Sequence, residues 1–269
     1  MDLLNPTLAL TASPELAPAP SARTAPALEV VWARHLDEVQ AAQRLRFAVF
    51  ATEMGADLSA SPDAAQGLDI DAFDNHCEHL LVRTAPDAGR AAQVVGTYRV
   101  LLPQAACRAG SYYSESEFDL GPLAALRPHM AELGRSCIHP DWREGAVIMM
   151  LWSHVVKFLA QNGVRHAVGC ASMPIRDGGY HAARVWRQLE ASHLTEPHLR
   201  VQPHAPLPLD HLQSQGAVEV PPLIRGYLKC GARVMGPPAW DPEFGVADLP
   251  MWLDLDALPA SYRRRFLGA

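Results

Sequence analysis

The chain has 269 residues, 49% of them hydrophobic, which suffices for one large core or two small ones. Its formal net charge of −6 argues against a general nucleic-acid-binding protein, because phosphate contacts need a basic surface. The five scattered cysteines lack a C-x-x-C spacing, so we expect neither a disulfide framework nor a metal cluster. No uncharged apolar stretch reaches the roughly 20 residues that span a bilayer, and no secretory signal is visible. We therefore expect a cytoplasmic protein.

The chain is predicted to begin with a disordered N-terminal arm. Residues 1–27 are rich in Ala, Pro, Ser and Thr, which predicts disorder, and the remainder, 28–269, is predicted to form one domain. The loop at 55–76 is too long for a simple connector and is expected to be functional. In chain order we predict a strand at 28–33, a helix at 36–53, the loop at 55–76, strands at 78–84 and 93–102 joined by a turn around 86–89, and irregular structure at 103–128 with a short helix near 117–126.

The second half contains the strongest helix signal. Apolar residues recur at helical spacing over 146–161, and Asn162-Gly163 marks the helix end. The other elements predicted here are strands at 130–138, 165–172 and 250–255, helices at 180–191 and 223–230, and a loop rich in Pro and His at 197–222. Strands that alternate with packed helices predict an α/β fold, with a twisted mixed β-sheet of about six or seven strands flanked by helices.

Charged residues stand inside or beside apolar stretches in the first half of the chain. Unpaired charge is costly in such places, so these residues either neutralise one another or contact a polar substrate. The set, with one aromatic residue among them, is Arg46, Phe50, Asp71, Asp74, Arg99, Glu132 and Arg135.

The strand at 130–138 is predicted to contain a β-bulge. In a regular strand Glu132 and Arg135 would point to opposite faces, and one inserted residue at Gly134 would bring them to the same face. A bulge leaves backbone groups unpaired, and an extended ligand such as a pantetheine arm can pair with them. In the alternative interpretation, Glu132 and Arg135 only form a structural ion pair.

A turn at 142–145 follows the bulged strand and leads into the strongest helix. A helix N-terminus offers free N–H groups and partial positive charge, which attract phosphate. The order of strand, turn and helix therefore favours an acyl-pantetheine transferase, although a routine helix cap remains the alternative. The residues predicted to bind the acyl-pantetheine are Gly134, Ser136, Cys137, Ile138, Arg143 and Gly145.

This arrangement resembles the acyl-CoA-binding core of the GCN5-related N-acyltransferases. Their pyrophosphate loop is richer in glycine than 143–148 of this chain, where Gly145 stands alone. A donor whose pantetheine hangs from a carrier protein has a single phosphodiester and needs less of that loop. The charged set also resembles, in order and spacing, the markers of acyl-homoserine-lactone synthases, except that Ala56 stands near the place of an expected tryptophan.

Over roughly residues 40–255 the chain is most similar to ornithine–acyl-carrier-protein N-acyltransferases. The stretches that carry this resemblance are 46–55, 71–82, 95–99, 113–119, 132–137 and 169–174. The resemblance implies the GCN5-related fold and transfer of a fatty acyl group, 3-hydroxylated in this family, from acyl carrier protein to the α-amino group of ornithine. It implies no cofactor beyond the acyl-carrier donor. The alternatives are a lactone synthase, a non-catalytic acyl-carrier or lipid-binding module, and a thiol-dependent hydrolase.

The reaction needs a neutral amine, so a carboxylate is predicted to take the amine's proton. Glu132 is the first candidate and Glu53 is the second, and Arg135 is grouped with them as a predicted catalytic residue. Asp71 and Asp74 are predicted to hold the cationic amino groups, with loop capping as their alternative, and Arg99 to bind the acceptor carboxylate, with a bond to Asp74 as its alternative. Arg46 is predicted to be a structural or substrate-orienting cation, and Phe50 is predicted to contact the substrate.

Three further motifs remain open. Cys137 and Cys170 could form an acyl-enzyme, although free cysteine in an apolar strand is usually a small buried hydrophobe. Residues 76–79, with two histidines and a cysteine, could bind metal, but a fourth ligand is not evident. The basic and apolar segment 262–267 could contact the acidic carrier protein or the inner membrane surface, or could be a solvated helix end.

Overall fold

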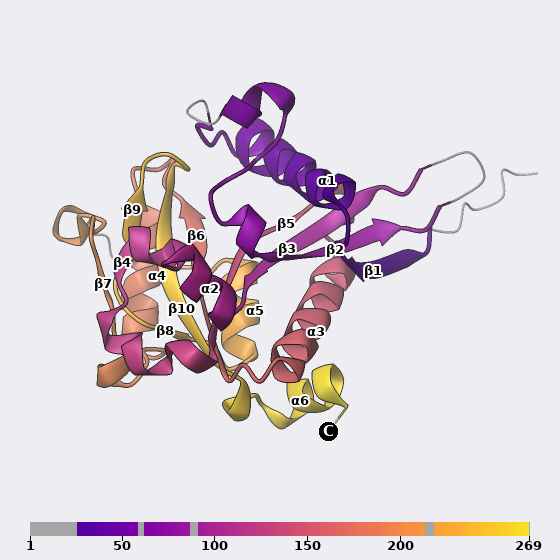
Figure 1. The fold of residues 1–269 in the computed structure, drawn as a ribbon. Coiled ribbons are helices and arrows are strands. Elements are labelled where there is room, and N and C mark those ends of the chain that lie inside the picture. The colour runs from indigo at the N-terminus through magenta and orange to yellow at the C-terminus, as the bar shows by residue number, and fades with distance from the viewer. Residues whose placement is uncertain (1–25, 59–61, 87–90, 213–217, 269) are drawn as a thin grey trace, which may run out of the picture.

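The computed structural model describes residues 26–58, 62–86, 91–212 and 218–268, and it is built around an eight-stranded sheet (Figure 1). The predicted disordered arm, except for its last two residues, and most of the predicted turn around 86–89 lie outside the described residues. None of the described helices is long and apolar enough to cross a membrane.

The strands run in the order β1-β2-β3-β5-β6-β10-β8, and β9 also pairs with β10. Neighbours are antiparallel except for β5 and β6, which are parallel, so the predicted mixed sheet is confirmed. The strands of this sheet are β1 Leu28–Trp32, β2 Glu78–Thr84, β3 Val94–Leu101, β5 Met130–Ile138, β6 His166–Pro174, β8 Arg233–Val234, β9 Ala239–Asp241 and β10 Val246–Asp254. A separate ribbon joins β4 Phe118–Asp119 and β7 Gln202–Pro203.

Helices cover both faces of the sheet. Figure 1 shows α1 and α3 on opposite sides of the half formed by β1, β2, β3 and β5, with α4 and α5 beside the other half. The apolar stripe of α3, including Leu151 and Val155, packs on Leu80 and Val100, so the strongest predicted helix is confirmed. The helices are α1 Leu36–Phe47, continued by a π-helical turn over Ala48–Glu53, α2 Pro103–Ala109, α3 Ala146–Gln161, α4 Tyr180–Glu190, α5 Pro222–Lys229 and α6 Ala260–Leu267.

The sheet has a seam between β5 and β6. The two strands pair only from Met130 to Glu132, opposite His166 to Val168, and beyond that point they separate. One residue beyond the last pair the two backbones are still very close, because a Cβ atom on Gly169 would lie 2.3 Å from the backbone oxygen of Leu133. The residues of β5 after Glu132 therefore have no strand neighbour on the β6 side, so the unpaired backbone that the sequence attributed to a bulge arises here from the separation of two strands.

The predicted bulge is present, but it lies one residue further along the strand. Thr97 is opposite Cys137 and Arg99 is opposite Gly134, so two residues of β5, Arg135 and Ser136, oppose one residue of β3. The left-handed backbone belongs to Arg135, with φ 48°, and Gly134 has no positive φ. A non-glycine residue in this conformation is held by its surroundings, and here the guanidinium of Arg135 is bound on several sides, as described below.

Several predicted boundaries were wrong, and prolines account for most of them. The short helix near 117–126 is replaced by β4 and a 3₁₀ helix over Gly121–His129, which contains two prolines. Helix α2 was missed because Pro103, at its first turn, resembles a helix breaker. Strand β10 begins four residues before the predicted start because Pro250 lies in its interior, and the two short strands β8 and β9 were not predicted.

Candidate functional site

A cavity of about 390 Å³ opens where β5 and β6 separate. Tyr98 and Arg99, which are consecutive on β3 and therefore point to opposite faces, both line it, so the cavity passes through the sheet. The predicted site residues on its walls are Phe50, Arg99, Glu132, Gly134, Arg135, Ser136, Cys137, Ile138 and Arg143. The predicted residues that are not on its walls are Arg46, Glu53, Asp71, Asp74 and Gly145.

The carboxylate of Glu132 is buried and bound by one short segment. Its Oε2 accepts a hydrogen bond from the backbone N–H of Tyr113 (2.7 Å), and its Oε1 accepts from the N–H of Ser114 (2.7 Å) and from the Ser114 hydroxyl. Burial raises the pKa of Glu132, while the bonds from Ser114 and Tyr113 act in the opposite direction. Among the described residues Glu132 has no ion pair with Arg135, so the alternative of a structural pair between them is wrong.

Three arginines and three aspartates form a buried network behind one wall of the cavity. Arg46 binds Asp74 through Nη1 and Nη2 (2.8 and 2.7 Å) and Asp69 through Nε (2.8 Å). Arg99 Nη1 binds Asp71 (2.6 Å) and Asp74 (3.1 Å). Burial alone would raise the pKa of Asp74, but the bonds and charges of Arg46 and Arg99 lower it well below its ordinary value.

This network changes the interpretation of the predicted aspartates. Asp71 and Asp74 are already neutralised by arginines, so they do not offer free negative charge to a cationic substrate. Arg99 does bind Asp74, which was the alternative stated for it, and it also reaches the cavity wall. Asp69, the partner of Arg46, was missed, although its place two residues before Asp71 put it in the same loop.

Arg135 connects the network to the cavity. Its Nη2 donates a hydrogen bond to Asp71 (3.3 Å), and its Nε lies 3.7 Å from a carboxylate oxygen of Asp69, which is an ion-pair distance. Its guanidinium carbon also stands 5.0 Å from the ring centre of Tyr113 and 4.5 Å from that of Phe244. These contacts hold the left-handed residue of the bulge and place its charge on the cavity wall.

At the other end of β5, Arg143 lies at the cavity wall and pairs with Glu53. The two side chains make a bidentate pair with distances of 2.6 and 2.7 Å, and Arg143 Nε also donates to the backbone oxygen of Ile138 (3.1 Å). The hydrogen bond from Arg143 lowers the pKa of Glu53. Glu53 is therefore a weak base away from the cavity wall, and Gly145, with φ 93°, caps the start of α3 nearby.

Three further carboxylates line the cavity and were not predicted. The side-chain oxygens of Glu117, Asp241 and Asp248 lie within 4.8 Å of one another. Asp248 accepts a bond from the Ser172 hydroxyl (2.6 Å), whereas the buried Glu117 carboxyl meets no N–H or hydroxyl donor among the described residues and shares a hydrogen bond with the Asp248 carboxyl. Burial, and then repulsion by neighbouring carboxylates, raises the pKa of Glu117, and burial raises the pKa of Asp248. We call these three residues the acidic trio.

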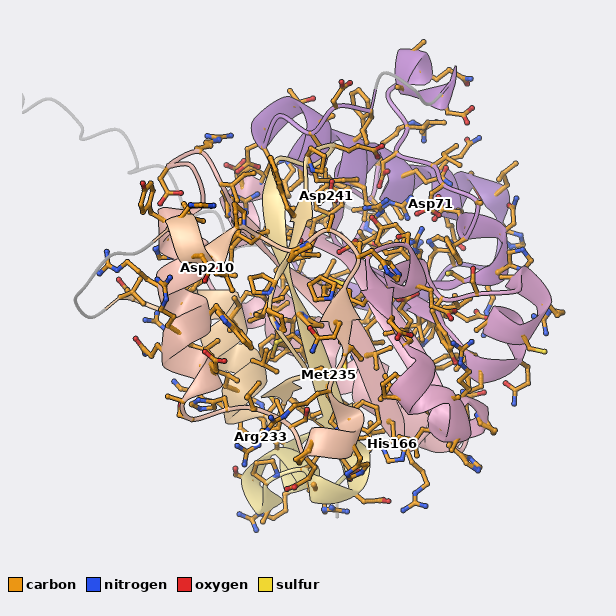
Figure 2. The ribbon with its side chains drawn as sticks, turned by 90° about the vertical axis from the view of Figure 1, so that its left-hand side faces the viewer. Asp71, His166, Asp210, Arg233, Met235 and Asp241 are labelled. Carbon is orange, nitrogen blue, oxygen red and sulfur yellow. The ribbon has the colours of Figure 1, made fainter. Side chains whose placement is uncertain are left out.

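The acidic trio brings together distant parts of the chain, since Glu117 precedes β4, Asp241 ends β9 and Asp248 lies in β10. Figure 2 shows Asp241 and Asp71 toward the same end of the molecule, with His166 at the opposite end. One sequence signal could have identified the trio: Asp248 is a lone charge in an otherwise apolar stretch, Val246 to Leu249, where charge needs a partner or a ligand.

The remaining motifs do not form reactive centres. Burial raises the pKa of Cys137 to about 12 and that of Cys170 well above its ordinary value, so neither thiol is an activated nucleophile. His79 points inward, with Nε2 3.0 Å from the backbone oxygen of Asp74. Within the described ranges the acidic trio is the one group of three side chains placed to share a cation, and residues 76–79 do not form such a group.

Comparisons with known proteins agree with the predicted fold and chemistry. The family described as acetyltransferase (GNAT) domain matches residues 45–153. The chain is 33% identical over 246 residues to the L-ornithine N(alpha)-acyltransferase of Brucella abortus (strain 2308), covering 87% of each protein. It is also 33% identical over 248 residues to the protein of the same name from Rhizobium meliloti (strain 1021), covering 87% of this chain and 82% of that protein.

Among solved structures, the crystal structure of the AHL synthase LasI aligns with a TM-score of 0.50 and 14% sequence identity. The alignment covers 91% of this chain and 97% of LasI. At that identity the likeness concerns the fold alone. Together with the family match, it confirms the predicted twisted mixed sheet of the GCN5-related type.

Proposed function

This chain belongs to the family of L-ornithine N(alpha)-acyltransferases, and from that premise we propose how its cavity holds the two substrates. The reaction transfers an acyl group to the α-amino group of L-ornithine. A neutral amine attacks the carbonyl carbon of a thioester, the C–N bond forms, the C–S bond breaks, and the thiol leaves. One proton must leave the amine, and the sulfur must gain one.

Glu132 takes the proton from the amine in this proposal. A carboxylate has about four lone-pair sites, and Tyr113 and Ser114 occupy three of those on Glu132. The free site is on Oε2, which accepts only one of these bonds. The raised pKa of the buried carboxyl brings it closer to that of an amine, which makes proton transfer easier.

The acidic trio holds the side-chain ammonium of ornithine. Ornithine carries two amino groups, and only one of them is acylated, so the other needs a fixed place. The buried Glu117 oxygens lie in the wall of the same cavity as Glu132 with no basic, N–H or hydroxyl donor among the described residues, only the neighbouring Asp248 carboxyl, and this observation carries the proposal. At neutral pH the raised pKa values keep a proton on the trio, and the ammonium displaces it. Arg135, with Arg99 beside it, faces the ornithine carboxylate.

We propose acyl carrier protein as the donor. The β5 backbone beyond Glu132 faces the gap and can pair with the amides of a pantetheine arm. The turn before α3 has one glycine, and its Arg143 is shared with Glu53, which suits a single phosphodiester better than a pyrophosphate. N–H groups of the β5 edge near Gly134 stabilise the negative oxygen of the reacting thioester.

The test compares L-ornithine with L-norvaline, which has the same carbon skeleton without the side-chain amine, using acyl-carrier-protein and acyl-CoA donors and mass spectrometry of the products. We expect the wild type to prefer ornithine in kcat/KM by at least about tenfold, since hydrogen bonds to charged groups contribute about 1.5–3 kcal/mol. Glu117→Gln and Asp248→Asn should lose that preference through KM. Glu190→Gln, at an exposed site on α4, is the matched control.

Each outcome separates one part of the proposal from the rest. An unchanged ornithine preference in both variants would remove the role of the acidic trio. Equal use of acyl-CoA would remove the carrier preference, and donor binding without product from any amine would favour a binding module instead of an enzyme. Ornithine binding at neutral pH should release protons, because the ammonium displaces a proton from the acidic trio, and calorimetry in two buffers of different ionisation enthalpy measures this release. Prior treatment with EDTA, which removes bound metal ions, should not alter it.

A further inference from the structure

One short segment connects the proposed base with the proposed ammonium site. It spans residues 112–117 and contains a 3₁₀ turn, and we call it the 112–117 turn. The backbone N–H groups of Tyr113 and Ser114 in this turn bind the carboxylate of Glu132. Glu117, at the end of the turn, is a member of the acidic trio. The position of this turn therefore sets the distance between the base and the place of the ammonium group.

Glu115 closes the 112–117 turn from outside the cavity. Its side chain is not on the cavity wall, and its Oε2 accepts a hydrogen bond from the backbone N–H of Tyr112 (2.8 Å). This bond is the one that the glutamate of a capping box makes. Arg127, in the 3₁₀ helix Gly121–His129, binds both oxygens of the same carboxylate, and its guanidinium carbon stands 5.6 Å from the ring centre of Tyr112. Glu115 is thus fixed from two sides.

Both ends of the 112–117 turn are anchored to the sheet region. Tyr112 is buried, and its hydroxyl donates to the backbone oxygen of Met130 (2.8 Å), the first residue of β5. Burial raises the pKa of Tyr112 to about 12, so this phenol keeps its proton at physiological pH. At the other end, the backbone N–H of His204 donates to the backbone oxygen of Glu117 (2.8 Å). Because the ends are anchored, the bond that Glu115 accepts sets the direction of the N–H groups between them.

We infer that Glu115 is a positioning residue, which holds the 112–117 turn in the conformation that orients Glu132 and places Glu117 without itself touching the substrate. This inference rests on the acyl transfer to ornithine proposed above. The side chains of Glu115 and Arg127 are 27% and 35% exposed, and an ion pair in such a position contributes little to overall stability. A displacement of about 1 Å in a catalytic group, in contrast, can lower the rate by about 10²-fold. Loss of Glu115 therefore affects catalysis more than folding.

The experiment compares Glu115→Ala, which removes both the hydrogen bond and the ion pair, with Glu115→Gln, which keeps an oxygen for the Tyr112 N–H. The measured quantities are kcat/KM for ornithine and for norvaline, and the pH profile with ornithine. In Glu115→Ala we expect kcat/KM with ornithine to fall by at least about tenfold.

Two further changes in Glu115→Ala report the position of the turn. The bonds from Ser114 and Tyr113 lower the pKa of Glu132, so a displaced turn should move the rise in activity to higher pH. The preference for ornithine over norvaline should also fall, because Glu117 moves with the turn. Glu115→Gln should lie between the wild type and Glu115→Ala in both respects.

Asp256→Asn is the matched control, because Asp256 binds Arg165 (2.8 Å) in a similar exposed ion pair before the start of β6. It should keep the wild-type preference and pH profile. If Glu115→Ala keeps both as well, or loses only thermal stability, the positioning role is refuted while acyl transfer stands. If Glu115→Ala does not fold, Arg127→Gln, which removes only the ion pair, must show the same two changes at smaller size, and wild-type behaviour of that variant refutes the role. If the wild type forms no product, the proposed function itself fails.

Discussion

Replacing Glu132 by Gln tests the proposed base with a side chain of nearly the same shape. Three donors point at the carboxylate, and an amide supplies only one oxygen to them. If the amide nitrogen faces Tyr113, one donor is left unpaired; if it faces Ser114, two are. A buried unpaired donor costs about 1–3 kcal/mol, which corresponds to about 2–4 °C in Tm for each kcal/mol in a chain of this size.

The effect of Glu132→Gln on catalysis should be larger than its effect on stability. Loss of a general base lowers kcat by about 10²–10⁴-fold, so we expect kcat to fall by that amount while thermal unfolding shows a folded protein. Binding of the acyl-carrier donor, measured separately by calorimetry, should persist. A variant that retains kcat within about threefold of the wild type would show that Glu132 has a structural role only.

The pH dependence gives a second measure of the same carboxylate. The activity of the wild type should rise with pH as Glu132 and the substrate amine lose their protons. The bonds from Ser114 lower the pKa of Glu132, so Ser114→Ala, which removes the hydroxyl, should raise that pKa and move the rise to higher pH. The amine is the same in both enzymes, so the difference between the profiles reports Glu132. Coincident profiles would refute the assignment.

Three further predictions follow from the surroundings of the cavity. Asp74→Asn should destabilise the protein by about 3–5 kcal/mol, because it removes one of the two carboxylates that compensate each of the buried residues Arg46 and Arg99 and leaves them with Asp69 and Asp71 alone. The stability that Asp74 contributes is complete above its ordinary pKa of 3.8 and is lost as the pH falls below it, and denaturant unfolding across pH measures both effects. Cys137→Ala and Cys170→Ala should retain acyl transfer, because neither thiol is an activated nucleophile. If the wild type forms a covalent acyl-enzyme that mass spectrometry detects, and either variant loses it, the thiol mechanism would be supported instead. Replacing Arg264 and Arg265 by Gln should weaken flotation with anionic vesicles if α6 contacts a membrane surface, and equal flotation would exclude that contact.

The packing of α6 makes charge substitution a better test of membrane contact than removal of the helix. Phe266 is buried in a small core with Val156 and Leu258, so the apolar part of the segment is not available to a membrane in this conformation. Removal of the helix would expose α3 and confuse loss of folding with loss of binding. The arginines are the part of the predicted basic segment that charge substitution can test without disturbing this core.

The elements that the sequence predicted well are those whose pattern is local. The apolar stripe of α3 repeats at helical spacing, and the strands at 78–84 and 130–138 were predicted at the boundaries that the structure shows. The bulge was also predictable, since Glu132 and Arg135 are an odd number of residues apart in a strand. Its position was not, because the contacts of Arg135 with Asp71 and two aromatic rings, all distant in sequence, decide which residue becomes left-handed.

The partners of the charged residues were harder to predict than their presence. Spacing suggested that Glu132 pairs with Arg135, yet Glu132 binds a backbone segment before β4, and Arg135 binds the loop after α1. The acidic trio was missed for the same reason, because its members come together only when β10 lies beside β6 and the segment after α2 folds back over the sheet. Local patterns indicate that a buried charge needs a partner, but only the tertiary fold determines which one.

The short seam between β5 and β6 also has a mechanical consequence. One half of the sheet, β1 to β5, meets the other half through three residues of each strand, whereas β6 is joined to β10 along its whole length. A small rotation about those three residues would widen the gap at its open end, as in a hinge, and would leave the hydrogen-bond ladders within each half unbroken. Such a movement would admit a long thioester arm and release an amphiphilic product through the same opening.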